Sequence, residues 1–284
     1  MFIYQSRFLT RGEVWYDDEP DNAPVDWIYY RQRSSPVAGA RSRETHTLLV
    51  DLTPSPDQLL ARMDQKTALK INAALAKDHL AWERGDARDA KTLNEVERLW
   101  NEFAAAHKSP PLERDWFDKI AEAGNLNLSA AKDPTGQTLA YHLVLLTRQR
   151  ARQLIAISPY RALPDAAWRN AVSRANCFIH WKNFLDFRTR GIPFFDWGGW
   201  YMGTTNIQYL GINRFKQSFG GRIVREFECE QIRTLKGWCV LTAARLIRRA
   251  GLLKPTAGGS QRPAPSPKPT THATAKDSQI SPAF

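Results

Sequence analysis

Short runs of alternating apolar and polar residues fill the first 52 positions of the chain. The runs are rich in aromatic and β-branched residues, and clusters of Gly, Pro, Asp and Asn separate them; they read FIYQSRF, GEVWYDD, DWIYYRQR and THTLLVDL. Alternation with a period of two, bounded by turn residues, is typical of strands. We therefore expect three or four strands in a meander, which form a small N-terminal β layer over residues 1–52.

The apolar spacing changes to a helical one after residue 52. In QLLARMDQKTALKINAALAKD the apolar residues recur every three or four positions, which predicts a helix that is broken near Thr67. A strand is expected in LAWERGD, and an apolar stripe predicts helices over residues 92–106 and 113–123.

The second half of the body again mixes strands with helices. Three strands in an antiparallel meander are expected in NLNLSAAKD, TLAYHLVLLTRQ and ARQLIAIS. A long helix from Pro164-Asp165 to Gly191 follows, then the strand IPFFDW, a Gly-rich loop, a helix over residues 206–219 and the strand RIVREFECE. Sequential hairpins among helices predict a mixed α+β domain of the α/β type, rather than an all-parallel sheet, over residues 53–230.

The C-terminal part differs in composition from the body. Residues 231–254 carry six Lys or Arg and no acid, and their apolar positions fit an amphipathic helix. Residues 255–284 hold six of the 17 prolines and few large apolar residues, a composition typical of a disordered tail. The predicted organisation is therefore 1–52, 53–230, 231–254 and 255–284.

Composition limits the class of protein. With 284 residues, 43% of them hydrophobic and 24% charged, the chain can bury a sizeable core and is neither disordered nor a small disulfide scaffold. Its three cysteines have none of the paired spacings of a zinc site, so no metal is expected and a reducing, cytoplasmic setting fits. No signal-peptide pattern and no run of 18 apolar residues occurs, and the net charge of +11 favours anionic partners.

Two motifs go beyond generic pattern. They are FFDWGGW (194–200) and GINRFKQSFGG (211–221), which runs into the strand RIVREFE; a third segment, VDLTPSPDQLLARMDQKTALKINAALAKD (50–78), precedes them. Together they resemble the Fem-type peptidoglycan-bridge aminoacyltransferases, a branch of the GNAT-type N-acyltransferase superfamily. The resemblance covers roughly residues 46–230.

The resemblance implies a GNAT-like fold with a splayed central mixed sheet, in which an acyl donor enters between two parallel strands. It implies that Lys216 stabilises the oxyanion or the donor ester, and that Phe215 stacks on the nucleotide end of the donor. Asp196 would orient the acceptor or accept its amine proton, and Gly198 and Gly199 would permit close approach of the substrates.

One difference from the coenzyme-A-dependent relatives limits the choice of acyl donor. These have a Q/R-x-x-G-x-G/A loop whose amides hold the pyrophosphate, whereas residues 158–168 read SPYRALPDAAW, with no glycine and two prolines. Only Arg161 is a candidate phosphate contact there. Aminoacyl-tRNA is therefore favoured over coenzyme A, no tightly bound cofactor is expected, and the basic segment 231–254 fits an RNA backbone or an anionic membrane surface.

The acceptor side is less well defined. Lys66 and Lys70 lie in the entry segment, where the family's "KTR" reads Lys66-Thr67-Ala68, and His107 and Lys108 end a predicted helix; all four are candidate acceptor contacts. Relatives with a tRNA donor have two such domains in tandem, whereas this chain has one domain and a short β layer.

Nucleophile motifs are absent, which fits direct attack by a substrate amine. We expect His142 and His180, each inside a predicted element, to be structural.

The sequence thus predicts an acyltransferase that transfers an aminoacyl or acyl group to an amine on a cell-envelope glycan or peptidoglycan-type precursor, which is lipid-linked if the enzyme works at the inner face of the cell membrane. Two alternatives stay open. One is a coenzyme-A-dependent N-acetyltransferase acting on an amino sugar or small amine; the other is a non-catalytic RNA- or membrane-binding protein built on a degenerate acyltransferase domain.

Overall fold

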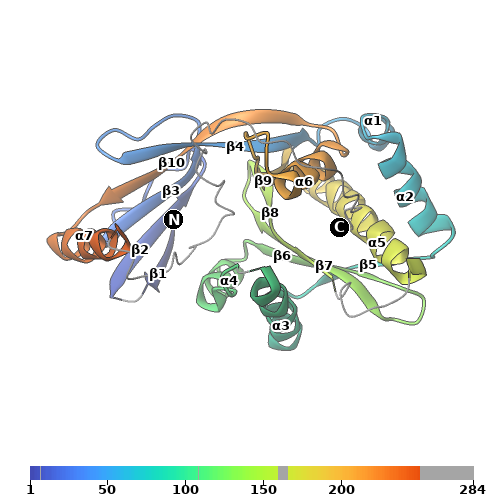
Figure 1. Ribbon diagram of the computed structural model, residues 1–284, viewed down its shortest axis with the longest axis horizontal. Coiled ribbons are helices and arrows are strands. Elements are labelled where there is room, and N and C mark those ends of the chain that lie inside the picture. The colour runs from blue at the N-terminus through green and yellow to red at the C-terminus, as the bar shows by residue number, and fades with distance from the viewer. Residues whose placement is uncertain (7, 108, 159–165, 250–284) are drawn as a thin grey trace, which may run out of the picture.

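A computed structural model describes residues 1–6, 8–107, 109–158 and 166–249, and in these ranges ten strands form one mixed sheet with seven helices around it (Figure 1). The strands are β1 (Phe2–Ser6), β2 (Leu9–Trp15), β3 (Trp27–Arg33), β4 (Arg41–Asp51), β5 (Ala81–Gly85), β6 (Leu126–Lys132), β7 (Thr138–Leu146), β8 (Arg150–Ile157), β9 (Phe194–Gly199) and β10 (Arg222–Ile232). The helices are α1 (Pro56–Ala61), α2 (Gln65–Ala76), α3 (Ala90–His107), α4 (Arg114–Glu122), α5 (Ala166–Thr189), α6 (Ile207–Gln217) and α7 (Leu235–Arg249). The strand order is β1-β2-β3-β10-β4-β9-β8-β7-β6-β5.

The four N-terminal runs are strands, as predicted, but the expected meander is wrong in its pairing. β2 and β3 are parallel, and β10 lies between β3 and β4, antiparallel to both. A parallel pair needs a crossover rather than a tight turn, and residues 16–26 supply it. Through β10 and β4, residues 1–52 share one sheet with the rest of the body.

The central feature of the sheet is a parallel pair that separates. β5, β6, β7 and β8 form an antiparallel meander, which confirms the prediction for residues 126–157. β8 and β9 are parallel and pair only where residues 150–152 meet residues 194–196. β8 then bulges opposite Leu143 and Val144, and a bulge bends its strand, so the two strands diverge towards their carboxyl ends. The sheet is therefore splayed, as the predicted fold class requires.

Helices cover both faces of the sheet. α3 and α4 pack on one face through apolar side chains such as Val96, Phe117 and Ile120. α1, α2, α5 and α6 lie on the other face (Figure 1), where α5 buries Phe178 and Phe184. These two apolar layers hold the splayed strands in place between them.

The helix break that was expected near Thr67 lies a few residues before it in the chain. α1 ends at Ala61 and α2 begins at Gln65, because the Asp64 side chain accepts a hydrogen bond of 2.8 Å from the Lys66 amide and starts a new helix. Thr67 is buried inside α2, and its hydroxyl donates to Ser218 Oγ at 2.8 Å.

α7 lies at the outer edge of the molecule, beside β2 (Figure 1). It is part of the predicted basic helix 231–254; the tail 255–284 lies outside the described residues. Among the helices that the structure describes, none is long and apolar enough to cross a membrane.

Candidate functional site

Asp196 lies on β9 at the point where β8 and β9 part, and it is fully buried. Its Oδ1 accepts hydrogen bonds from the Thr47 hydroxyl and from the Gly198 amide, the latter at 2.8 Å. Its Oδ2 accepts from Gln32 Nε2 at 2.8 Å. Hydrogen bonds from three segments therefore hold this carboxylate in one position.

Glu226, from β10, is a second buried carboxylate beside Asp196. The Gln32 Nε2 group, which donates to Asp196, also donates to Glu226 Oε2 at 2.7 Å, and Arg150 donates to Oε1. Burial and the nearby charge of Asp196 raise the pKa of Glu226 to about 7, although Arg150 and Gln32 oppose the rise. Glu226 therefore has the protonation behaviour of a general base near neutral pH.

Lys216, near the end of α6, supplies a buried cation close enough to Asp196 to be affected by its charge. Its ammonium group donates to the Gly199 carbonyl at 2.7 Å, and the side chain is only 7% exposed. Burial, and then repulsion by Arg152, lower the pKa of Lys216 to about 8, while Asp196 opposes the fall. At neutral pH most Lys216 side chains are therefore protonated, and one of their three N–H groups is used by the protein.

The Gly198 backbone lies against Arg152. A Cβ at position 198 would lie 3.0 Å from Arg152 Nη1, and the backbone φ of Gly198 is +71°, a conformation that favours glycine. Arg152 Nη1 is itself 3.5 Å from Asp196 Oδ1, and Arg150 Nη1 is 3.5 Å from Asp196 Oδ2. Three cations and two carboxylates thus gather where the strands diverge.

Several buried polar atoms around this cluster have no hydrogen-bond partner among the described residues. They include the Tyr16 hydroxyl, Gln32 Oε1 and Arg152 Nε. Tyr16 and Gln32 also have positive φ angles, +57° and +52°, and such strain in a non-glycine residue is found mostly at functional sites. A polar ligand or water at this position would satisfy these groups.

Four of the predicted site residues come together in the structure: Lys216, Asp196, Gly198 and Gly199. Phe215 is half-buried, and its ring contacts Trp197 and Phe219 at centroid distances of 5.8 and 5.3 Å. Phe215 therefore packs on the aromatic core beside Lys216, and its stacking on a donor stays a prediction.

The other predicted contacts are more scattered. Lys66 and Lys70 lie on the exposed surface of α2, where Lys70 Nζ donates to Ser173 Oγ at 3.0 Å. His107 is the last residue of α3. Arg161 and Lys108 lie outside the described residues. Acceptor binding by Lys66, Lys70, His107 or Lys108, and donor binding by Arg161, therefore stay predictions.

His142 and His180 are core residues. Their rings lie 4.1 Å apart, and His180 lies 4.3 Å from the Trp197 ring. Burial lowers the pKa of His142 to about 3 and keeps the pKa of His180 well below its ordinary value. Both rings are therefore neutral at physiological pH. Within the described ranges, no group of three or more His, Cys, Asp or Glu side chains is placed to hold a metal ion.

Six residues of the cluster were not predicted from the sequence, namely Tyr16, Gln32, Thr47, Arg150, Arg152 and Glu226. The sequence could have indicated some of them, because charged residues alternate inside the strand segments RARQ and REFECE. Charge at every second position of a buried strand indicates a polar patch on one face of the sheet.

No protein-family model matches the sequence, and no curated protein matches it. Among solved structures, the crystal structure of FemX matches with a TM-score of 0.59 and 13% identity, over 77% of this chain and 74% of that one. The C-terminal domain of a putative lysylphosphatidylglycerol synthetase from Agrobacterium fabrum matches with a TM-score of 0.49 and 17% identity, over 77% and 72% of the two chains. The structure of L-PGS from Bacillus licheniformis matches with a TM-score of 0.49 and 12% identity, over 76% and 72% of the two chains. The chain therefore shares the fold of FemX.

Proposed function

We propose that this protein transfers an acyl or aminoacyl group to an amine on a cell-envelope glycan or peptidoglycan-type precursor. The observation that carries the proposal is the buried ammonium of Lys216, which lies beside Asp196 and Arg152 where the parallel strands diverge. A fixed cation in a water-poor site stabilises a developing oxyanion more strongly than water does. The class of acceptor is inferred from the resemblance to the Fem-type enzymes.

The proposed reaction needs no enzyme nucleophile. The acceptor amine attacks the carbonyl carbon of the donor, and the carbonyl electrons move onto oxygen, where Lys216 donates a hydrogen bond. When the oxyanion collapses, an amide forms and the bond to the leaving group breaks. The amine proton goes to a carboxylate, and the leaving oxygen or sulfur takes up a proton in turn.

Glu226 is the better candidate for accepting the amine proton. Asp196 accepts hydrogen bonds from Thr47, Gly198 and Gln32, which fix its position, whereas Glu226 has a pKa of about 7 and changes protonation at neutral pH. Gln32 connects the two carboxylates. Asp196 is therefore assigned a positioning role and Glu226 the role of general base.

Aminoacyl-tRNA is the proposed donor, supported by the sequence of residues 158–168, which lacks the glycines of a pyrophosphate loop. Thermal shift and calorimetry with charged tRNA and with acyl-coenzyme A, at several salt concentrations, test this choice. A ligand at a hundredfold excess over its Kd stabilises the folded state by about 2.7 kcal/mol, so occupancy is measurable.

Salt-sensitive binding of tRNA would support the aminoacyl donor. Salt-tolerant binding of the thioester would select the coenzyme-A-dependent alternative. Binding of neither donor would contradict the proposed function and favour a non-catalytic role.

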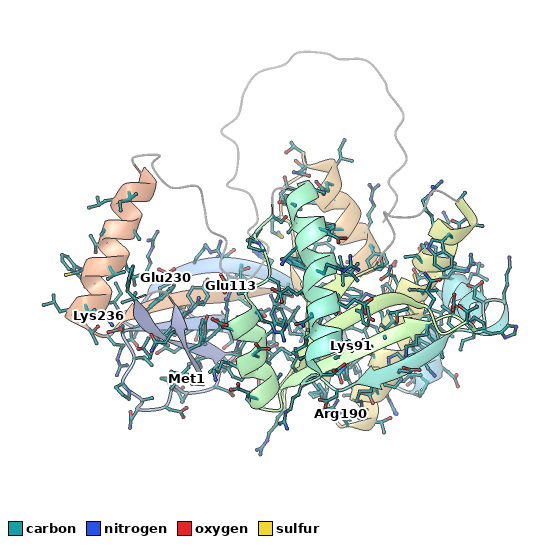
Figure 2. The ribbon with its side chains drawn as sticks, turned by 90° about the horizontal axis from the view of Figure 1, so that it is seen from below. Met1, Lys91, Glu113, Arg190, Glu230 and Lys236 are labelled. Atoms are coloured by element: carbon teal, nitrogen blue, oxygen red, sulfur yellow. The ribbon has the colours of Figure 1, made fainter. Side chains whose placement is uncertain are left out.

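We also propose that α7 attaches the protein to an anionic membrane surface. Positions 235, 239, 242 and 246 share one side of the helix, and Leu235 and Leu246 on that side are 77% and 59% exposed. The opposite side packs on the body at Gly237, where a Cβ would lie 2.5 Å from the Asp26 carbonyl. The apolar side of this helix therefore faces outward, at the edge of the molecule in both views (Figure 2).

Charge favours a lipid surface as the partner of this apolar side. Residues 231–249 hold five Lys or Arg and no acid, and Trp238, 56% exposed, lies beside the leucines. Basic residues next to exposed leucine and tryptophan are typical of helices that lie in the headgroup region of anionic bilayers. An RNA backbone would be attracted by the charge but would not cover the leucines.

Vesicle sedimentation tests the attachment. The double variant Leu235→Ser/Leu246→Ser is expected to lose binding to phosphatidylglycerol-containing vesicles. The control variant Ile207→Ser/Leu69→Ser replaces two aliphatic side chains on α6 and α2. Their exposed fractions, 76% and 59%, match those of Leu235 and Leu246. Equal binding by the two double variants would refute the role of α7, and so would binding of tRNA instead of vesicles.

A further inference from the structure

A cavity of about 310 Å³ opens at the amino ends of β8 and β9, next to the buried charge cluster. Its polar lining comes from Arg148 and Gln149 in the β7–β8 turn and from Arg150 and Arg222, which begin β8 and β10. Leu49 and Phe194 are among the apolar lining residues. No site residue predicted from the motifs lines this cavity.

Strand register places the cavity and the charge cluster on one face of the sheet. Arg150 is paired with Phe194, and Arg152 is paired with Asp196, so all four side chains project to the same side. The cavity residue Phe194 therefore precedes Asp196 by two positions of β9, about 7 Å along the strand. The cavity and the charge cluster therefore adjoin on one face of the sheet, and Arg150 belongs to both.

β10 shows the same arrangement. Arg222 and Glu226 are four positions apart on one strand, so they project to the same side. Arg222 is registered opposite Leu49 of β4. Gly221 permits this close approach, because its φ is +103° and a Cβ there would lie only 2.5 Å from the Leu49 carbonyl. Position 222 is thus fixed at the cavity by backbone contact.

The cavity is positively charged. Three arginines line it and no Asp or Glu does so. Arg150 is paired on its inner side with Glu226, whereas Arg148 and Arg222 are exposed, and no ion pair within the described residues includes either of them. Burial raises the pKa of Asp51, but hydrogen bonds from Thr53 and the weaker effect of the Arg222 charge lower it below its ordinary value. Two guanidinium groups therefore face the cavity without a carboxylate partner on its wall.

We infer that this cavity binds an oxyanion, a phosphate or a carboxylate, carried by the acceptor substrate. The inference rests on the proposed function and deepens it, since it names a chemical property of the acceptor. Guanidinium groups pair with carboxylate and phosphate in a bidentate geometry. The oxyanion lies against Arg148 and Arg222, the adjoining carbon atoms cover Phe194 and Leu49, and the amine points along β9 towards the buried charge cluster.

Direct binding of two probes tests the inference. Inorganic pyrophosphate represents the phosphate source and glutarate the carboxylate source, and calorimetry at low ionic strength measures their binding to the full chain. The double variant Arg148→Gln/Arg222→Gln is expected to weaken binding of the preferred probe by at least about tenfold. The control Arg41→Gln/Arg233→Gln removes the same charge from two exposed positions outside the cavity, and its Kd is expected to stay within about twofold of wild type.

Each outcome decides the question. Preferential loss in the cavity variant supports the site, and the probe that binds identifies the oxyanion. Equal weakening in both variants would show a non-specific charge effect and overturn the proposal, as would the absence of binding to the wild type by either probe.

A kinetic measurement separates this site from the proposed function. Arg222→Gln is expected to raise the KM for the acceptor with kcat nearly unchanged, because Arg222 contacts a remote part of the substrate. If the variant loses probe binding but keeps the wild-type KM for the acceptor, the oxyanion bound in the cavity is not part of the acceptor, and the inference fails while the proposed function stands. Probe binding without acyl transfer by the wild type would refute the proposed function and leave the oxyanion site standing.

Discussion

Replacing Lys216 with methionine is expected to make the protein more stable and less active. Methionine has a similar length and removes the charge. The ordinary lysine pKa of 10.5 falls to about 8 at this position, and each unit of pKa corresponds to about 1.4 kcal/mol. Burying the protonated side chain therefore costs about 3 kcal/mol at pH 7.

Two opposing effects determine the change in unfolding free energy of Lys216→Met. Lys216→Met removes the cost of burying the charge but also removes the hydrogen bond to the Gly199 carbonyl, which contributes about 1 kcal/mol. The variant should therefore gain about 2 kcal/mol of unfolding free energy at pH 7. The folded protein releases the Lys216 proton above about pH 8, while the unfolded chain keeps it until about pH 10.5. Wild-type stability therefore rises relative to the variant between these values, and the advantage of the variant disappears by about pH 10.5.

Urea unfolding at pH 7 and pH 10 measures both effects, because the free energy of unfolding comes from the same titrations without any substrate. Lys91→Met is the control, since it makes the same chemical change at an exposed position of α3 (Figure 2) and is expected to change stability by less than about 0.5 kcal/mol at either pH. A Lys216→Met variant that is less stable at pH 7, or a difference that does not depend on pH, would show that burial does not lower the pKa of Lys216. Acyl transfer by Lys216→Met is expected to fall by about 100- to 1000-fold.

The remaining predictions concern pH and backbone geometry. The rate of acyl transfer should rise as Glu226 ionises near pH 7 and fall as Lys216 loses its proton above about pH 8, and Glu226→Gln should abolish the rise; kcat/KM from pH 5 to 10 measures this, and an unchanged acid limb in the variant would exclude Glu226 as the base. Gly221→Ala should cost about 3–5 kcal/mol, since its Cβ would meet the Leu49 carbonyl, whereas Gly124→Ala, at φ +74° in open space, should cost about 1–2 kcal/mol. Equal losses of unfolding free energy in the two alanine variants would contradict the close contact at Gly221.

Most of the local structure could be predicted, because it depends on spacing within one element. The strands and helices of residues 79–157 are confirmed since each has its own apolar period and turn residues. The pairing of the N-terminal strands depends instead on β10, which enters between β3 and β4 from far along the chain. The helix break predicted near Thr67 lies at Asp64 instead, and the hydroxyl of Thr67 is bonded to Ser218, which lies on another segment.

The candidate site divides in the same way. Lys216 and Asp196 could be found because each belongs to a short motif with glycines, aromatic residues and a turn close by in the sequence. The partners of Glu226 are Arg150, 76 residues away, and Gln32, 194 residues away, so its environment depends on tertiary contacts. Its pKa near 7 likewise depends on burial beside Asp196, which only the assembled sheet produces.

Acyl transfer by this protein is tested most directly by measuring the mass of the acceptor after incubation with the protein and a donor. Charged tRNA and acyl-coenzyme A are supplied separately, each with an amine-bearing peptidoglycan-type precursor. Wild-type protein is expected to add one acyl or aminoacyl group to the amine, and Lys216→Met, although folded, to add it at least about 100-fold more slowly. Equal rates for the two proteins, or no modified acceptor with either donor, would contradict the proposed transfer.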